Sequence, residues 1–142
     1  MLNDNVSMTG TLTVKKNGKV EREVKNLVVT TGKQLVAANL AGGSTEVTHM
    51  AVGTGSTAAA AGDTALGSEI DRNALTTSGG TASSNTVTFD CTWNAGDGTG
   101  ALTEAGLFTA SSGGTMLART VFAVVNKGAD DTVTISWVIT VS

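Results

Sequence analysis

The chain has 142 residues, which fits one domain, and it carries a net charge of −3 with only 15% charged residues. Its single cysteine excludes an internal disulfide and a cysteine metal cluster, and no apolar run reaches the roughly 18 residues of a membrane-spanning helix. Eighteen glycines, abundant threonine and the absence of proline and tyrosine favour strands and turns, so the composition predicts an all-β protein.

The first nine residues are polar and have no helix or strand pattern, so we expect a flexible arm over 1–9 and a single domain over 10–142. This stretch also lacks the basic and apolar regions of a signal peptide, so we expect synthesis in a cytoplasm. Leu12 and Val14 then alternate with threonines, and Asn-Gly at 17–18 separates them from a second extended run. An Asn-Gly pair between two such runs predicts a β-hairpin.

Basic residues gather in the first quarter of the chain, but Glu21 and Glu23 lie among them. A nucleic-acid groove is typically a continuous basic stripe, so the mixture predicts two solvated strands of mixed charge and no nucleic-acid partner. The basic residues concerned are Lys15, Lys16, Lys19, Arg22, Lys25 and Lys33.

The apolar spacing then becomes helical, between Leu35 and Leu40. Thr31 is a candidate N-cap, and the glycine pair that begins at Gly42 ends the pattern. The sequence therefore predicts one short α-helix near residues 31–41. No other segment has a comparable helical pattern.

The stretch VTHMAVGTGSTA, at 47–58, is a strand-like run that leads into Gly-x-Gly-x-x-Ala. A dinucleotide-binding fingerprint has this spacing, but it also needs a long helix after the glycines, whose N-terminus meets the pyrophosphate. Here Gly62 interrupts any helix within two turns, and no second parallel strand follows. We therefore expect a glycine-rich loop that leaves a strand, and no cofactor.

Two later runs alternate between apolar and polar residues, as strands with one face on a core do. Turns rich in Gly, Ser, Asp and Asn separate the strand-like runs, so the sequence predicts an antiparallel β-sandwich, with a jelly roll as one form of it. The apolar faces are Val87, Phe89, Cys91 and Trp93 in the first run, and Val133, Ile135, Trp137, Ile139 and Val141 in the second.

The run at 115–126 differs from these two, because it is apolar on both faces over much of its length. Such a strand is either central, with something packed on each side, or it lies at an interface between subunits. The sequence pattern is compatible with both arrangements.

The other candidates for chemistry are isolated residues. His49 is the only histidine and has no assignable catalytic partner, so a surface or interface position is favoured. Cys91 shares its face with aromatic residues, which predicts a buried thiol. Asp97 and Glu104 have the oxygen ligands that calcium prefers, but without EF-hand spacing, so a connecting loop is favoured. We expect no metal, no catalytic residue and no enzyme activity.

Three stretches together resemble a family of small structural proteins of tailed-phage particles: VKNLVVTTGKQLVAANLAGG at 24–43, VTHMAVGTGSTAAAAGDTALGSEIDR at 47–72, and GALTEAGLFTASSGGTMLARTVFAVVNKG at 100–128. The likeness covers the chain from about Val20 onward. Members of this family are described as head decoration (cement) proteins, as tail-fibre-like proteins, or simply as structural proteins. The resemblance implies a place on the virion and brings no catalytic residues with it.

The resemblance implies a decoration protein on the capsid surface, which binds the major capsid protein, associates as a homotrimer and stabilises the shell. The alternative is a tail or fibre component, structural or host-surface-binding. The candidate capsid contacts are Asn3, Asp4, Asn5, Val6 and Met8 in the arm and Lys15, Lys16, Lys19 and Arg22 in the hairpin; the candidates for self-association are Met116, Leu117, Arg119, Val121, Phe122 and Val124.

Overall fold

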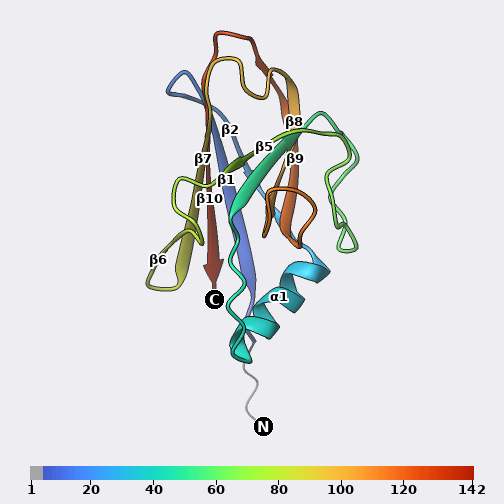
Figure 1. Ribbon diagram of the computed structural model, residues 1–142, viewed down its shortest axis with the longest axis vertical. Coiled ribbons are helices and arrows are strands. Elements are labelled where there is room, and N and C mark those ends of the chain that lie inside the picture. Colours follow the sequence, from blue (N-terminus) through green and yellow to red (C-terminus); the bar gives the residue numbers. More distant parts are fainter. Residues whose placement is uncertain (1–4) are drawn as a thin grey trace.

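Two antiparallel five-stranded sheets packed face to face form the body of the protein (Figure 1). The computed structural model describes residues 5–142 and confirms the all-β sandwich. Sheet A has the strand order β2-β1-β10-β7-β6, and sheet B has the order β3-β9-β8-β4-β5. The strands of sheet A are β1 (Met8–Lys16), β2 (Lys19–Lys25), β6 (Thr81–Ser83), β7 (Thr86–Trp93) and β10 (Val133–Val141); those of sheet B are β3 (Leu27–Val28), β4 (His49–Gly53), β5 (Glu69–Ala74), β8 (Gly100–Phe108) and β9 (Met116–Lys127).

The connections alternate between hairpins within one sheet and crossovers between the sheets. The pairs β1–β2, β4–β5, β6–β7 and β8–β9 are antiparallel neighbours in the same sheet. The chain crosses to the other sheet after β2, β5, β7 and β9. A jelly roll is built from two Greek keys, whose connections mostly cross between the sheets. Here hairpins within one sheet alternate with the crossovers, so the protein is a β-sandwich other than a jelly roll.

The core lies between the two sheets and is made by the inward-facing residues of the alternating strands. Trp93 and Trp137 are fully buried at its centre, and Cys91 and Ile135 lie beside them with no exposed surface. These positions confirm the predicted faces of β7 and β10. Val141 is the exception, because it lies at the end of β10 and is 40% exposed.

The predicted hairpin joins β1 to β2. Asn17 and Gly18 have φ angles of 52° and 82°, the left-handed backbone that a two-residue hairpin turn requires. β1 begins at Met8, inside the expected arm. Ser7 extends the pairing further, because it exchanges backbone hydrogen bonds of 2.7 and 2.9 Å with Ser142. The chain is therefore held to sheet A from Ser7 onward.

One helix, α1 (Thr30–Leu40), lies across the end of the sandwich where β1 begins and β10 ends (Figure 1). It confirms the predicted helix, and Gly42 with a φ of 96° follows it. Thr31 is not the N-cap, as we expected from the sequence: Val29 takes that position, and the Thr31 hydroxyl donates to the Met116 carbonyl at 2.8 Å. Within residues 5–142, no helix is long and apolar enough to cross a membrane.

A glycine brings α1 close to β9. Gly32 is buried, and a Cβ atom there would collide with the backbone carbonyl of Leu117. Leu35 and Val36 pack against the core from the same side of the helix. Leu40 was expected on this apolar face but is 85% exposed, because it lies at the last helical residue and beyond the edge of the sandwich.

Replacing Gly32 with Ala should destabilise the protein, although Ala is better than Gly in a helix interior by about 1 kcal/mol. The added methyl group meets the Leu117 carbonyl, and overpacking of this kind costs about 1–3 kcal/mol. Urea unfolding, followed by the fluorescence of the two buried tryptophans, measures the change. Gly62→Ala is the control, because nothing lies within 4 Å of a methyl group there. Equal effects of the two substitutions would contradict the close packing of α1 on β9.

Candidate binding surfaces

The glycine motif of the sequence binds a carboxylate of its own chain. β4 leads into the connection 54–68, which lies along the outer face of sheet B (Figure 1). The Glu104 carboxylate, on β8, accepts hydrogen bonds from the backbone N–H groups of Gly55, Gly67 and Ser68 at 2.7, 2.8 and 2.7 Å. A Cβ atom at Gly53 or Gly55 would collide with this carboxylate. The motif is therefore a structural loop, as we expected.

Arg119, on β9, holds the same connection from the other side. Its guanidinium group contacts Glu104 at 3.0 Å and Asp63 at 2.9 Å, and it donates to the Thr57 carbonyl at 2.9 Å. Glu104 is 0% exposed and Arg119 is 2% exposed. Burial alone raises the pKa of Glu104, but the backbone N–H groups and Arg119 outweigh burial, so the pKa lies below its ordinary value. The Ala60 N–H and Arg119 likewise lower the pKa of Asp63, against a smaller effect of burial.

The connection 54–68 also explains why β9 is apolar on both faces. Beneath it is a second small core on the outer side of sheet B, where Leu66 packs with residues of β4, β8 and β9. The first sequence alternative, something packed on each side, therefore describes the first part of this strand, where Met116 lies in the second core while Leu117 and Ala118 lie in the main one. Four of the self-association candidates, Met116, Leu117, Arg119 and Phe122, are buried within the single chain, whereas Val121 is half-buried and Val124 is exposed. Self-association through β9 thus has little free surface in this chain.

Two of the basic hairpin residues, Lys16 and Arg22, bond to the open edge of sheet B. Arg22 donates to the carbonyls of Ala123 and Val124 at 2.9 and 2.7 Å, and Lys16 donates to the Asn126 carbonyl at 3.3 Å. β3 is too short to pair with this part of β9, so these carbonyls lie on an open strand edge. Arg22 and Lys16 therefore have an intramolecular role.

The structure separates the remaining capsid-contact candidates. Met8 and Lys16 are the two ends of β1, about 27 Å apart at 3.4 Å per residue. Asn5, Val6, Lys15 and Lys19 are exposed, and Asn3 and Asp4 lie outside the described residues. The arm and the hairpin turn are thus at opposite ends of the sandwich, joined by one strand.

The central strands of the outer face of sheet A are rich in hydroxyl groups and poor in charge, whereas the edge strand β2 places Lys25 and Glu23 opposite Thr11 and Thr13. Across β1, β10 and β7, four successive cross-strand rows each have at least two threonine or serine side chains facing outward. Lys15 and Asp90 are the only charged side chains in these rows. We call this set the hydroxyl face, and its rows are Thr9–Thr140–Thr86, Thr11–Val138–Thr88, Thr13–Ser136–Asp90 and Lys15–Thr134–Thr92.

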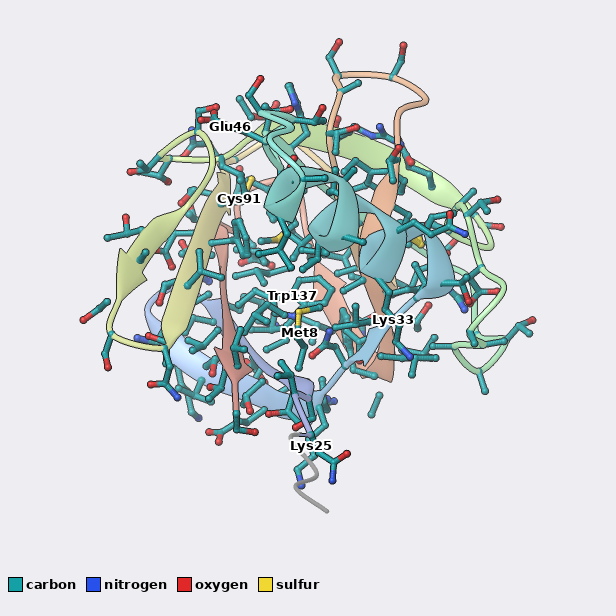
Figure 2. The ribbon with its side chains drawn as sticks, turned by 90° about the horizontal axis from the view of Figure 1, so that it is seen from below. Met8, Lys25, Lys33, Glu46, Cys91 and Trp137 are labelled. Carbon is teal, nitrogen blue, oxygen red and sulfur yellow. The ribbon has the colours of Figure 1, made fainter. Side chains whose placement is uncertain are left out.

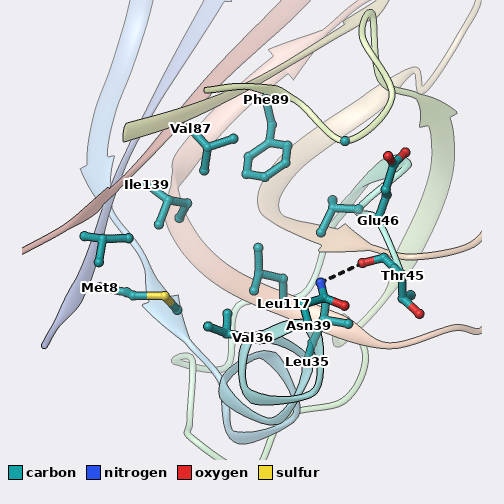
Figure 3. Close-up of a pocket in the computed structure, with 13 residues that line it drawn as sticks. Met8, Leu35, Val36, Asn39, Thr45, Glu46, Val87, Phe89, Leu117 and Ile139 are labelled. Atoms are coloured by element: carbon teal, nitrogen blue, oxygen red, sulfur yellow. Dashed lines mark hydrogen bonds between the residues drawn. The ribbon is translucent and has the colours of Figure 1, made fainter. Parts of the chain in front are cut away.

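The second open surface is an apolar groove at the α1 end of the sandwich, with a volume of about 330 Å³ (Figure 3). Strands of both sheets and α1 line it, so side chains far apart in the sequence meet there. Polar groups lie at its rim, where Asn39 donates to the Thr45 carbonyl at 2.9 Å and Glu46 accepts from Ser78 at 3.2 Å. Its apolar walls are Met8, Leu35, Val36, Phe89, Leu117 and Ile139.

Each of the isolated candidate residues has neighbours in the fold that bear on its chemistry. Burial raises the pKa of the Cys91 thiol to about 12, which matches the predicted buried thiol. His49 Nδ1 lies 2.7 Å from the Thr48 hydroxyl. Glu104 cannot share a calcium ion with Asp97, because it is buried under the connection 54–68. In residues 5–142, no three His, Cys, Asp or Glu side chains gather as a metal site.

The hydroxyl face and the apolar groove are therefore the two surfaces on which binding can be argued. The threonine alternation was visible in the sequence, but its continuity across three strands depends on their register. The groove has no sequence signal, because its walls come from five elements. No protein-family model, no curated protein and no solved structure matches the chain.

Replacing Glu104 with Gln should reduce the free energy of unfolding by up to about 3–5 kcal/mol at pH 7, because it leaves the buried Arg119 charge with Asp63 as its one remaining carboxylate partner. Urea unfolding with tryptophan fluorescence measures the loss. Glu69→Gln is the matched control: it breaks a bidentate pair with Arg72 in which the carboxylate is partly exposed to solvent, so the loss should be smaller. We call the buried pair of Glu104 and Arg119, with its bonds to the connection 54–68, the clamp. A loss of stability at Glu104 no larger than the loss at Glu69 would rule out a stabilising role for the clamp.

The stability should also fall in acid. Because the pKa values of Glu104 and Asp63 are lower in the folded chain than in the unfolded one, their contribution is complete above about pH 4.5. It is lost as the pH falls through the folded values. Free energies of unfolding at pH 7 and pH 3 should therefore differ more for the wild type than for Glu104→Gln. An identical pH dependence would exclude Glu104 as a source of acid sensitivity.

Proposed function

We propose that the protein is a structural protein of a tailed-phage particle, which decorates the head by binding the assembled major capsid protein. The observation that carries the proposal is the hydroxyl face of sheet A, a three-strand surface whose own charged side chains are Lys15 and Asp90, with Lys25 and Glu23 of β2 along one edge. The choice of the major capsid protein as the partner rests on the resemblance of three sequence stretches to phage virion proteins. No catalytic role is part of the proposal.

The composition of the hydroxyl face suits a protein interface. Charged residues are depleted at the centres of such interfaces, because their desolvation is costly. Threonine is β-branched and stiff, so it loses little conformational freedom when a partner covers it. A decoration protein binds by burying area across neighbouring subunits, at roughly 25 cal/mol per Å² of apolar surface, and needs no deep pocket.

The strand β1 would place several capsid contacts in one line. Thr9, Thr11, Thr13 and Lys15 face outward along it, and the segment before Ser7 continues from the same strand. An N-terminal segment of this kind can add to the edge of a partner sheet. In this proposal the arm and Lys15 contact the shell together, while Lys16 and Arg22 hold the sandwich closed.

Sedimentation with empty, expanded head shells of the phage that encodes the chain tests this proposal. The wild-type protein should pellet with the shells. The double variant Thr11→Glu, Thr88→Glu should bind at least tenfold more weakly, because it places two carboxylates in the interface that must be desolvated when the shell covers them. Ser111→Glu, in the exposed loop between β8 and β9, is the matched control and should bind as the wild type does.

Deleting residues 2–6 separates the contribution of the arm. Weaker binding by this variant supports a contact made by the arm, and unchanged binding removes the arm from the proposal. A wild-type protein that stays in the supernatant overturns the capsid role. If that protein instead binds host cells or purified surface glycans, the tail or fibre alternative is favoured.

A further inference from the structure

The apolar groove at the α1 end is bordered by apolar side chains that are left exposed by residues 5–142. Val6 is 77% exposed and Leu40 is 85% exposed, and Val141 on the groove wall is 40% exposed. Figure 2 shows this end of the molecule, with α1 across it and Met8 near the centre. An open groove flanked by projecting apolar side chains is typical of a contact with another protein.

The charges at the two ends of this surface are opposite. Lys33 is exposed beside Val6, Met8 and Val36, on the side where β1 begins. Glu46 is exposed at the far rim of the groove, next to the loop that holds Ser78. In Figure 2 the labelled Glu46 and Lys33 lie far apart on this end of the molecule, toward the upper left and the right. The surface is thus basic at one end, apolar in the middle and acidic at the other end.

A surface with this arrangement is complementary to itself. When two identical patches meet about a two-fold axis, residue i of one copy contacts residue j of the other, and j contacts i. With the axis through the middle of the groove, Lys33 of each copy faces Glu46 of the other. The same rotation turns the projecting Leu40 and Val6 of each copy toward the apolar surface of the other.

We propose that the α1 end is a two-fold contact between two copies of this chain, in which Lys33 pairs with Glu46 across the interface and the apolar groove is closed. The contact uses a different surface from the hydroxyl face, so it does not depend on the proposed capsid role. It also differs from the homotrimer that the sequence resemblance implies, since a two-fold contact closes at two copies.

The oligomeric state in solution, measured by light scattering and by sedimentation equilibrium over a range of concentrations, tests this contact. The wild type should be a dimer that dissociates on dilution. Lys33→Glu and Glu46→Lys should each raise the dissociation constant at least tenfold, because each places like charges in contact twice in the dimer. Both side chains are exposed, and an acidic residue in the first turn of α1 suits the helix. Both variants should therefore fold.

Restoring the charge complementarity gives the sharpest result. The double variant Lys33→Glu, Glu46→Lys should dimerise as the wild type does. An equimolar mixture of the two single variants should form a heterodimer in which both pairs are again opposite in charge. Lys15→Glu makes the same charge change on the hydroxyl face, and it should leave the dimer unchanged.

Substituting the exposed Leu40 with Asp tests the apolar part of the contact and should also favour the monomer. A wild type that is monomeric at every concentration, or that is a trimer, would overturn the proposal. So would a dimer that the single charge reversals leave intact. Failure of shell binding with an intact charge-dependent dimer removes the capsid role alone, which keeps the two proposals distinguishable.

Discussion

The buried ion pair of Glu104 and Arg119 is the interaction on which the outer side of sheet B depends. A buried pair is by itself weak evidence of stability, because desolvation can exceed the attraction between the charges. Here the carboxylate also accepts three backbone N–H groups from a connection without secondary structure, and the guanidinium group reaches Asp63 and a backbone carbonyl. These bonds satisfy polar groups that a buried loop would otherwise leave unpaired. The connection can therefore lie on the sheet and close a second small core.

Because of this clamp, the outer faces of the two sheets differ in how far the chain itself covers them. Sheet B is covered on its outer side, and Arg22 and Lys16 occupy the open carbonyls at the edge of β9. The broad free surfaces that remain are the hydroxyl face of sheet A and the groove beside α1. Because one lies on the flank and the other at the end of the sandwich, the two contacts that we propose, with a shell and with a second copy, are compatible with each other. If both were made at once, they would bind far more tightly than either alone.

Much of the fold could be predicted because its signals are local. Alternation predicted β7 and β10 with their inward faces, the Asn17–Gly18 pair predicted the first hairpin, and helical spacing predicted α1. The errors are at positions where a distant strand competes with a local preference. Thr31 bonds to the Met116 carbonyl instead of capping its own helix. Glu104, which we expected in a connecting loop, lies in β8, and the connection 54–68 from another part of the chain covers its carboxylate.

By itself, the sequence determined the strand periodicity, the turns, the single helix and the failure of the glycine motif to meet the requirements of a dinucleotide site. Only the tertiary structure decided what the glycines bind, why β9 is apolar on both faces, and which basic residues are free. The same holds for the two open surfaces. The physical reason is that local patterns set which way each side chain points, whereas covering a face depends on pairings between distant segments. An apolar strand face has the same sequence pattern whether a partner protein or a loop of the same chain buries it.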